Sequence, residues 1–282
     1  MATGQLLLLG FLAGATIFIG LPLGRMQAVR PSVKTFLNAF SAGILVFLLF
    51  DILENAVEPI EHAVEQLKDG TGSAGTFIAL FAVFAAGLGA GLLSLAYLDK
   101  RRRSRRASSS IGPGAMAVAE ADAGTGPLAR SSALRLGLSI AAGIGLHNFS
   151  EGLAIGQAAG TGAVQFALVL VIGFALHNAT EGFGIVAPLA AEDVRPSWTY
   201  LLLAGVIGGG PTFLGTLLGR SVSSPYVFVA FLAMAAGAII YVVAELLNVG
   251  RKLGRWELTM WGVFVGFLLG LATEMVLVAA GA

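Results

Sequence analysis

The sequence predicts an all-α, polytopic membrane protein with eight transmembrane helices and both termini outside. Three observations predict this class: a very apolar composition, eight long apolar segments, and basic residues that gather in alternate loops. Hydrophobic residues make up 56% of the 282 residues and charged residues only 12%, whereas a soluble domain carries about 25% charged residues. The sequence has 39 glycines and no cysteine. The glycines suit helices that pack closely in lipid, and the lack of cysteine excludes disulfides and thiolate metal sites.

Eight apolar segments give the predicted spans. Each is close to the roughly twenty residues that a helix needs to cross the hydrocarbon core, and each is too long for a strand of a membrane barrel. The first segment is followed, not preceded, by basic residues, which favours a retained helix over a cleaved signal peptide. The predicted spans are residues 5–24, 35–54, 75–98, 133–157, 163–190, 198–219, 225–247 and 258–280.

The basic residues predict the orientation. If the N-terminus lies outside, fifteen of the 17 basic residues lie in or beside the inner loops, and only Lys68 and Arg220 face the outside. Cytoplasmic loops of membrane proteins carry such an excess of basic residues. We therefore expect a multi-pass protein of the cell membrane (inner or plasma membrane), surrounded by lipids, with both termini outside.

Three regions follow from this pattern. Residues 1–98 hold transmembrane helices 1–3, residues 99–132 form a flexible basic cytosolic loop, and residues 133–282 hold helices 4–8. The loop begins DKRRRSRR and then has little apolar content, which is typical of a segment without a packed core. Beside a membrane, its basic residues favour contact with anionic headgroups over binding of nucleic acid.

The segment after the second span is acidic. Glu54, Glu58, Glu61 and Glu65 recur at helical spacing, with apolar residues between them. We expect a short amphipathic helix that lies on the outer surface. A solvated face explains the acidic side, and an acidic mouth that concentrates cations is the functional alternative.

Two near copies of one motif lie in the middle of the fourth and fifth spans: HNFSEG at 147–152 and HNATEG at 177–182. Each begins thirteen or fourteen residues into its span, roughly 20 Å along a helix that rises about 1.5 Å per residue. Both motifs therefore lie near the bilayer midplane. Only the short link 156–162 separates the two spans, so the spans are antiparallel neighbours and the motifs meet at equal depth.

The residue types of the motif are those that bind a divalent transition metal. In each copy the His and the Glu are four residues apart and share one helix face. Imidazole and carboxylate suit zinc, and also iron or manganese, while the Asn adds a weak oxygen ligand. Unpaired ionised carboxylates at this depth cost on the order of several kcal/mol, so a metal ion, protons or both must neutralise them. The candidate metal ligands are His147, Asn148, Glu151, His177, Asn178 and Glu181.

Two other interpretations compete with a non-catalytic metal-binding site. A lone buried His is often only an interhelical hydrogen-bonding group, but two matched clusters at equal depth favour metal binding. An intramembrane metalloenzyme could use the same His and Glu residues on facing helices. Because the HExxH order is absent, we expect no enzyme.

The paired HN-x-x-EG motifs, the eight spans, the external termini and the long loop after the third span resemble the ZIP (Zrt/Irt-like) family of metal transporters. GPTFLG (210–215) resembles the sixth helix of that family, and LAMAAGAIIYVVAELL (232–247) resembles the seventh. The resemblance implies uptake of a divalent metal, usually zinc, into the cytoplasm. We therefore expect a transporter with no cofactor apart from the transported metal. It also implies inverted three-helix repeats around a central pair, helices 4 and 5, and an elevator-like slide of helices 1, 4, 5 and 6 against the rest.

The resemblance further implies where metal binds. It maps a primary site onto the His and Glu of both motifs, and a second site onto their Asn residues together with a Glu commonly supplied by helix 6. Residues 208–211 of this chain read GGGP, and Gly210 stands where that Glu is expected. We therefore expect one metal site. Ser150 and Thr180 replace a Pro found in many members, so kinks there are expected to be milder or to come from hydroxyl bonding to the backbone.

Four other acidic residues lie inside or at the ends of spans. Asp51 and Glu54 end the second span at the outer face and could hand metal inward, or simply be solvated by headgroups. Glu245 and Glu274 favour structural or interfacial roles. The many Gly and Ala residues on helices 2, 3, 7 and 8 allow a homodimer without requiring one.

Overall fold

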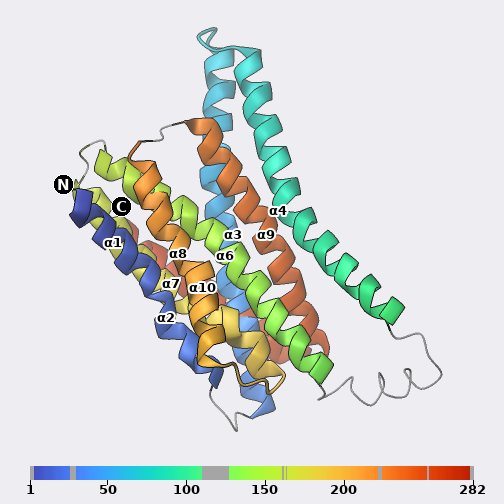
Figure 1. Cartoon of the computed structure of the whole chain (residues 1–282). Helices are drawn as coiled ribbons and strands as arrows, with labels where there is room; N and C mark the ends of the chain where they lie inside the picture. The colour runs from blue at the N-terminus through green and yellow to red at the C-terminus, as the bar shows by residue number, and fades with distance from the viewer. Residues whose placement is uncertain are drawn as a thin grey trace.

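A computed structural model describes residues 3–25, 30–109, 127–160, 162, 164–221, 224–252 and 254–279. All regular elements in these ranges are helices, which confirms the predicted all-α class (Figure 1). They are α1 (Thr3–Ala15), α2 (Ile17–Gly20), the 3₁₀ helix η1 (Leu21–Arg25), α3 (Pro31–Lys68), α4 (Ala74–Ser109), α6 (Pro127–Gly160), α7 (Val164–Ala191), α8 (Trp198–Gly219), α9 (Pro225–Lys252) and α10 (Trp256–Ala279).

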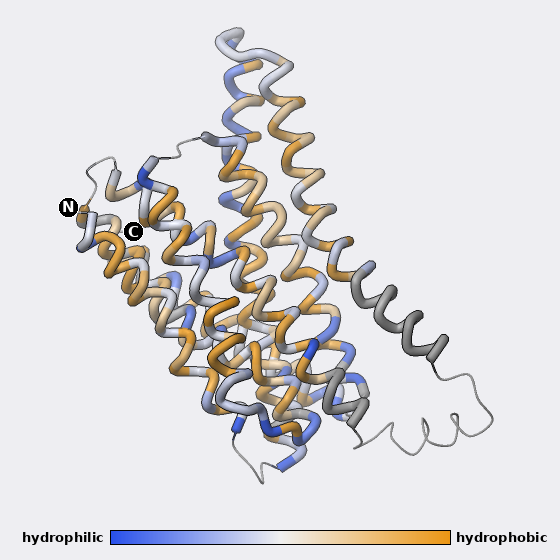
Figure 2. The backbone as a smooth tube through the Cα atoms, viewed as in Figure 1, coloured by the Kyte–Doolittle hydropathy of each residue, from blue (hydrophilic) through white to orange (hydrophobic). Residues whose placement is uncertain are grey.

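Seven helical segments of the described chain are long and apolar enough to cross a membrane, and Figure 2 shows hydrophobic residues along most of the bundle. The protein is thus a multi-pass membrane protein. α6 occupies the place of the predicted fourth span but is not among the seven. Its polar motif and its many glycines lower its hydropathy. The seven segments are Thr3–Arg25, Pro31–Lys68, Ala74–Tyr97, Leu170–Ala190, Trp198–Gly219, Pro225–Asn248 and Trp256–Val276.

The first span is not a single α-helix. α1 ends at Ala15, and the chain continues through α2 and η1. At the break, the Thr16 hydroxyl donates a hydrogen bond to the Ala13 carbonyl over 2.7 Å. Such a bond from Thr to the preceding turn accompanies local bending of a helix, and it lies close to the point where α1 meets the second motif.

The prediction of a separate helix on the outer surface is wrong. α3 is one continuous helix of 38 residues, about 57 Å long at 1.5 Å per residue. With α4 it forms a hairpin that stands beyond the rest of the bundle (Figure 1). Ile60 and Ala63 are buried against Leu80 of α4 and Val229 of α9. The apolar side of the acidic segment therefore packs on helices and not on the membrane surface.

The helices on either side of the predicted cytosolic loop are longer than expected. α4 continues to Ser109, and α6 begins at Pro127. Residues 99–109 and 127–132 of the predicted loop are thus helical. Residues 110–126 lie outside the described part of the chain.

Glycines bring certain helices into backbone contact. A Cβ added at Gly14 of α1 would lie 2.2 Å from the Gly209 carbonyl oxygen of α8, and one added at Gly152 of α6 would lie 2.1 Å from the Thr212 carbonyl of α8. A Cβ added at Gly182 of α7 would lie 2.0 Å from the Ile17 carbonyl of α2. Only glycine permits this approach. We call α1, α2, η1, α6, α7 and α8 the first helix group.

The remaining helices are joined in the same way. A Cβ added at Gly43 of α3 would lie 2.1 Å from the Val263 carbonyl oxygen of α10, and one at Gly91 of α4 would lie 2.0 Å from the Met234 carbonyl of α9. In addition, the buried Asn38 amide of α3 donates to the Leu246 carbonyl of α9 over 2.9 Å. We call α3, α4, α9 and α10 the second helix group.

The two groups share the main hydrophobic core, but they meet through side chains and without the close backbone approach found inside each group. A Cβ added at Gly143 of α6 would lie 3.4 Å from the Ala238 Cβ of α9, and one at Gly184 of α7 would lie 3.7 Å from the Ser41 Cβ of α3. These are ordinary van der Waals separations. α6 and α7, which carry the two motifs, are therefore the helices of the first group that face the second.

Candidate metal centre

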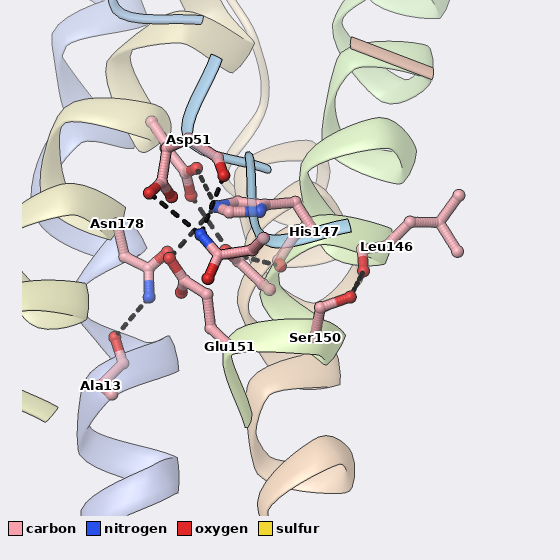
Figure 3. Close-up of polar contacts among 11 residues, drawn as sticks. Ala13, Asp51, Leu146, His147, Ser150, Glu151 and Asn178 are labelled. Atoms are coloured by element: carbon pink, nitrogen blue, oxygen red, sulfur yellow. Dashed lines mark hydrogen bonds and ion pairs between the residues drawn. The ribbon is translucent and has the colours of Figure 1, made fainter. Parts of the chain in front are cut away.

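Two helices bring the motif side chains together, as predicted from their spacing. His147 and Glu151 lie one turn apart on α6, with His147 Nε2 3.1 Å from Glu151 Oε1. The same nitrogen lies 3.8 Å from Glu181 Oε1 on α7. Figure 3 labels His147 and Glu151 at this centre. All three side chains are buried, with at most 5% of each exposed. His177 lies one turn before Glu181 on α7, but its side chain is outside the described part of the structure.

The two Asn side chains are oriented by backbone carbonyls from other helices. Asn148 Nδ2 donates to the Gly208 carbonyl of α8 over 3.0 Å and to Glu181 Oε2 over 3.2 Å. Asn178 Nδ2 donates to the Ala13 carbonyl of α1 over 3.0 Å. Both amides are fully buried. α1, α6, α7 and α8 therefore all hold part of the centre, and all belong to the first helix group.

Several buried oxygens of the centre accept no hydrogen bond from any described residue. They belong to carboxylates and amides that lie in the same space, and burying such acceptors without a donor costs free energy. A divalent cation is the complement of carboxylate and amide oxygens next to an imidazole. Within the described side chains alone, no three His, Asp or Glu groups form a complete metal cluster. The oxygens are Glu151 Oε1 and Oε2, Glu181 Oε1, Asn148 Oδ1 and Asn178 Oδ1.

A cavity of about 270 Å³ leads to this centre. It reaches His147 and Glu151, and it extends to Asn55, whose side chain is exposed. Because Asn55 lies toward the α3–α4 hairpin, the centre is approached from that end of the bundle. The cavity is lined by Asp51, Ile52, Asn55, His147, Ser150, Glu151, Ala154, Leu170, Phe174, Phe228, Leu232 and Glu274.

α8 contributes a backbone atom to the centre. Gly208 offers its carbonyl to Asn148, whereas Gly210 is partly exposed and a Cβ added there would meet only Val206, at 3.8 Å. No sequence pattern marks the Gly208 and Ala13 carbonyls as partners, because every residue carries a carbonyl. In the sequence, only the glycine-rich stretch of α8 indicates that a backbone approaches closely here.

The other acidic residues separate into two sets. Asp51 and Glu274 are half-buried and line the cavity, while Glu54 is exposed. Glu245 of α9 is half-buried and is not among the described residues that line the cavity. The predicted bonding of a motif hydroxyl to the backbone is confirmed at Ser150, whose Oγ donates to the Leu146 carbonyl over 3.4 Å.

A bundle of membrane-spanning helices around a buried His, Glu and Asn cluster defines a polytopic helical membrane protein with a polar centre. The ZIP zinc transporter family model matches residues 99–273. The chain is 29% identical to "Zinc transporter ZupT" of Chlorobium chlorochromatii (strain CaD3) over 92% of this chain and 94% of the relative. It is 30% identical to the protein of that name in Chlorobaculum parvum over 95% and 96% of the two chains. It is 32% identical to the protein of that name in Nitratidesulfovibrio vulgaris, over 90% of this chain and 92% of the relative.

The chain therefore belongs to the ZIP family of zinc transporters. These relatives are named as transporters, not as enzymes. The prediction of a transporter in place of an intramembrane metalloenzyme is confirmed at the level of the family.

Proposed function

We propose that this protein carries zinc across the cell membrane into the cytoplasm. The observation that supports this most strongly is the convergence of His147, Glu151 and Glu181 inside the bundle of a ZIP family member. Relatives that cover nearly the whole chain are named zinc transporters. Iron, manganese and cadmium suit the same ligand types, so they are the competing substrates to test.

The proposed site has His147, Glu151, His177 and Glu181 as its main ligands. Asn148 and Asn178 assist through their side-chain oxygens, because the amide nitrogens already donate to carbonyls. The zinc ion neutralises the buried carboxylates while it is bound, and protonation of those carboxylates aids its release. α8 supplies a carbonyl and not a carboxylate near the centre, which supports one metal site per chain.

The proposed topology has eight spans with both termini outside. α6 supplies the span that is missing from the seven, the fourth in chain order. A helix of 34 residues between α4 and α7 must cross the bundle to reach the start of α7. Residues 1–98 hold the first three spans, residues 99–132 connect them on the cytosolic side, and residues 133–282 hold the remaining five. The positive-inside pattern supports this orientation.

Reciprocal contacts support inverted three-helix repeats around α6 and α7. If the first three spans correspond to the last three, α3 corresponds to α9 and α4 to α10. The packing of α3 on α10 at Gly43 then corresponds to that of α9 on α4, where a Cβ added at Gly237 would lie 2.2 Å from the Leu88 carbonyl. The contact of α7 with α3 at Gly184 corresponds in the same way to the contact of α6 with α9 at Gly143.

The two helix groups support an elevator-like mechanism. The first helix group holds the whole metal centre and is joined by backbone contacts and hydrogen bonds to backbone carbonyls. The second group has its own backbone contacts, and the two groups meet at the looser separations of Gly143 and Gly184. In the proposed mechanism the first group slides against the second with zinc bound. Both groups keep their internal packing during the movement.

The surface of the protein allows a homodimer. The exposed face of α4 carries Ala82, Ala86 and Ala90 at a spacing of four residues. Small residues at this spacing let helices of two chains approach in lipid. The mass of the purified complex in nanodiscs tests this point.

Zinc flux into proteoliposomes that contain a fluorescent zinc indicator tests the proposed function. We expect flux in the wild type and none above background in His147→Ala and Glu181→Gln, because each removes a ligand of the centre. Competition by cadmium, iron and manganese ranks the metals. A well-folded wild-type preparation that moves no divalent metal would contradict the proposal.

A further inference from the structure

One buried hydroxyl of the bundle has no hydrogen-bond partner among the described residues. It belongs to Thr212 of α8, whose side chain is fully buried. Burying a hydroxyl without a partner costs free energy, so such a group in a folded protein calls for an explanation. The proposed metal site makes no use of Thr212.

The other five buried Ser and Thr side chains of the described chain follow one rule. Each hydroxyl donates to the carbonyl four residues earlier in its own helix, a common arrangement for these residues. Figure 3 shows one of these bonds, from Ser150 to the Leu146 carbonyl. By the same rule, Thr212 should donate to the Gly208 carbonyl. The five side chains are Thr35, Ser41, Ser150, Thr216 and Thr259.

The Gly208 carbonyl already has a side-chain donor from another helix. Asn148 Nδ2 of α6 donates to it over 3.0 Å. A carbonyl has two lone pairs, and inside an α-helix one of them accepts the backbone N–H four residues later. The carbonyl three residues before Thr212 is covered as well, since a Cβ added at Gly14 would lie 2.2 Å from the Gly209 oxygen. The Thr212 hydroxyl and the Asn148 amide therefore compete for one acceptor.

Asn148 has a second contact, which a bound zinc ion would disturb. Its Nδ2 also donates to Glu181 Oε2 over 3.2 Å. An N–H group and a cation compete for the lone pairs of one carboxylate, and their positive charges repel each other. Zinc on Glu181 would displace the amide nitrogen and attract Asn148 Oδ1, which accepts no hydrogen bond from a described residue. A turn of the amide in that direction also takes Nδ2 away from Gly208.

We propose that Thr212 is a positioning residue of the metal centre, which donates to the Gly208 carbonyl when zinc binding turns Asn148 away from it. The exchange needs only a change of the Thr212 χ1 rotamer, since Gly208 lies one turn earlier on the same helix. It gives the hydroxyl a partner and keeps a side-chain donor on the buried carbonyl, which lowers the cost of releasing Asn148. The zinc-dependent part rests on the proposed function, whereas the competition for Gly208 does not.

The zinc affinity of the purified full-length chain, measured by isothermal titration calorimetry, tests the zinc-dependent part. Thr212→Val removes the hydroxyl with little change of shape. We expect it to weaken zinc binding about tenfold, because the released carbonyl then lacks a second donor. Thr212→Ser retains the hydroxyl and should bind zinc as wild type does. Wild-type affinity in Thr212→Val would overturn the inference.

Thr216→Val is the matched control. Thr216 is also fully buried on α8, one turn further along, and its hydroxyl donates to the Thr212 carbonyl over 2.8 Å. Because this bond does not involve Asn148, the control should lower the unfolding temperature and leave the zinc affinity unchanged. A loss of affinity as large as that in Thr212→Val would show that any buried hydroxyl of α8 has this effect, and the inference would be wrong.

A double variant shows whether Thr212 acts through Asn148. In Asn148→Ala the Gly208 carbonyl is left to Thr212 with or without zinc. Adding Thr212→Val to that variant should therefore change its zinc affinity by less than about twofold. A further loss of about tenfold would mean that Thr212 acts on the metal independently of Asn148, and the exchange would be refuted.

Unfolding temperatures of the zinc-free protein test the competition for Gly208 without any metal. In the wild-type background, Thr212→Val removes an unsatisfied hydroxyl and should raise the unfolding temperature. In the Asn148→Ala background, it removes a hydroxyl that is bonded to Gly208 and should lower the unfolding temperature. A shift of the same sign in both backgrounds contradicts the inference, even if zinc binds as proposed. The expected change of sign in a chain that binds no zinc contradicts the proposed function and retains the competition between Asn148 and Thr212.

Discussion

Asn148 on α6 is hydrogen-bonded to Glu181 on α7: its Nδ2 lies 3.2 Å from the Oε2 of that carboxylate. The same nitrogen lies 3.0 Å from the Gly208 carbonyl of α8. One buried amide therefore connects the two motifs and fixes both to a third helix. It leaves the other carboxylate oxygen of Glu181 toward His147, at 3.8 Å from Nε2.

The first prediction follows from this contact. Asn148→Ala leaves two buried acceptors without their donor, which costs about 1–3 kcal/mol for each group left unsatisfied. Groups that orient a metal ligand are worth about 10- to 100-fold in metal affinity. We expect zinc affinity, measured by isothermal titration calorimetry, to fall by that factor.

Asn38→Ala is the matched control for this variant. Asn38 is also fully buried and donates to a carbonyl, that of Leu246, but it joins α3 to α9 within the second helix group. We expect a similar drop in the unfolding temperature and unchanged zinc affinity. Equal losses of affinity in both variants would mean that Asn148 acts only through stability.

The second prediction concerns the backbone contact between α1 and α8. A Cβ added at Gly209 would lie 2.1 Å from the Gly14 carbonyl, so Gly209→Ala must push α1 from α8. Overpacking of this kind costs about 1–3 kcal/mol. We expect a lower unfolding temperature in detergent and weaker zinc binding, because α1 also holds Asn178 through Ala13.

The neighbouring glycine provides the control. A Cβ added at Gly210 would meet only Val206, at an ordinary 3.8 Å. Gly210→Ala should therefore not lower the unfolding temperature, since alanine favours the helix, and should leave the zinc affinity as in wild type. A loss of stability in Gly210→Ala as large as that in Gly209→Ala would show that the effect does not come from the close approach, because alanine in place of glycine raises helix propensity.

The third prediction concerns which carboxylate of the centre a reagent can reach through the cavity. Glu151 lines the cavity and Glu181 does not, within the described residues. The reagent is a carboxylate-reactive carbodiimide that is small enough to enter the cavity, added from outside to intact proteoliposomes. It should modify Glu151 faster than Glu181, because only Glu151 is reached through the cavity. Mass spectrometry of the digested protein gives the two rates. Faster modification of Glu181 would contradict the described approach to the centre.

Much of the centre could be predicted from the sequence, for a physical reason. The four-residue spacing of His147 and Glu151 places them on one helix face, and the short link to α7 places Glu181 at the same depth. The backbone partners, such as the Gly208 carbonyl, could not be predicted, since they depend on how closely α8 packs. Nor could the continuous α3, because the acidic spacing from Glu54 onward fits an amphipathic helix whether it lies on a membrane or on α4 and α9.

The last prediction tests the movement of the two helix groups with engineered cysteines, which is straightforward because the sequence has none of its own. A Cβ at Gly143 would lie 3.4 Å from the Ala238 Cβ, close to the roughly 3.5–4.5 Å found between the Cβ atoms of disulfides. Gly143→Cys/Ala238→Cys, when oxidised, joins α6 to α9 across the group boundary. We expect oxidation to stop zinc flux while zinc binding stays intact, and reduction to restore the flux.

The two single variants, Gly143→Cys and Ala238→Cys, are the controls for that experiment. Neither can form a disulfide within the chain, so each should transport zinc at the wild-type rate before and after oxidation. If the oxidised Gly143→Cys/Ala238→Cys protein also transports at the wild-type rate, α6 does not move against α9, and the sliding mechanism is wrong.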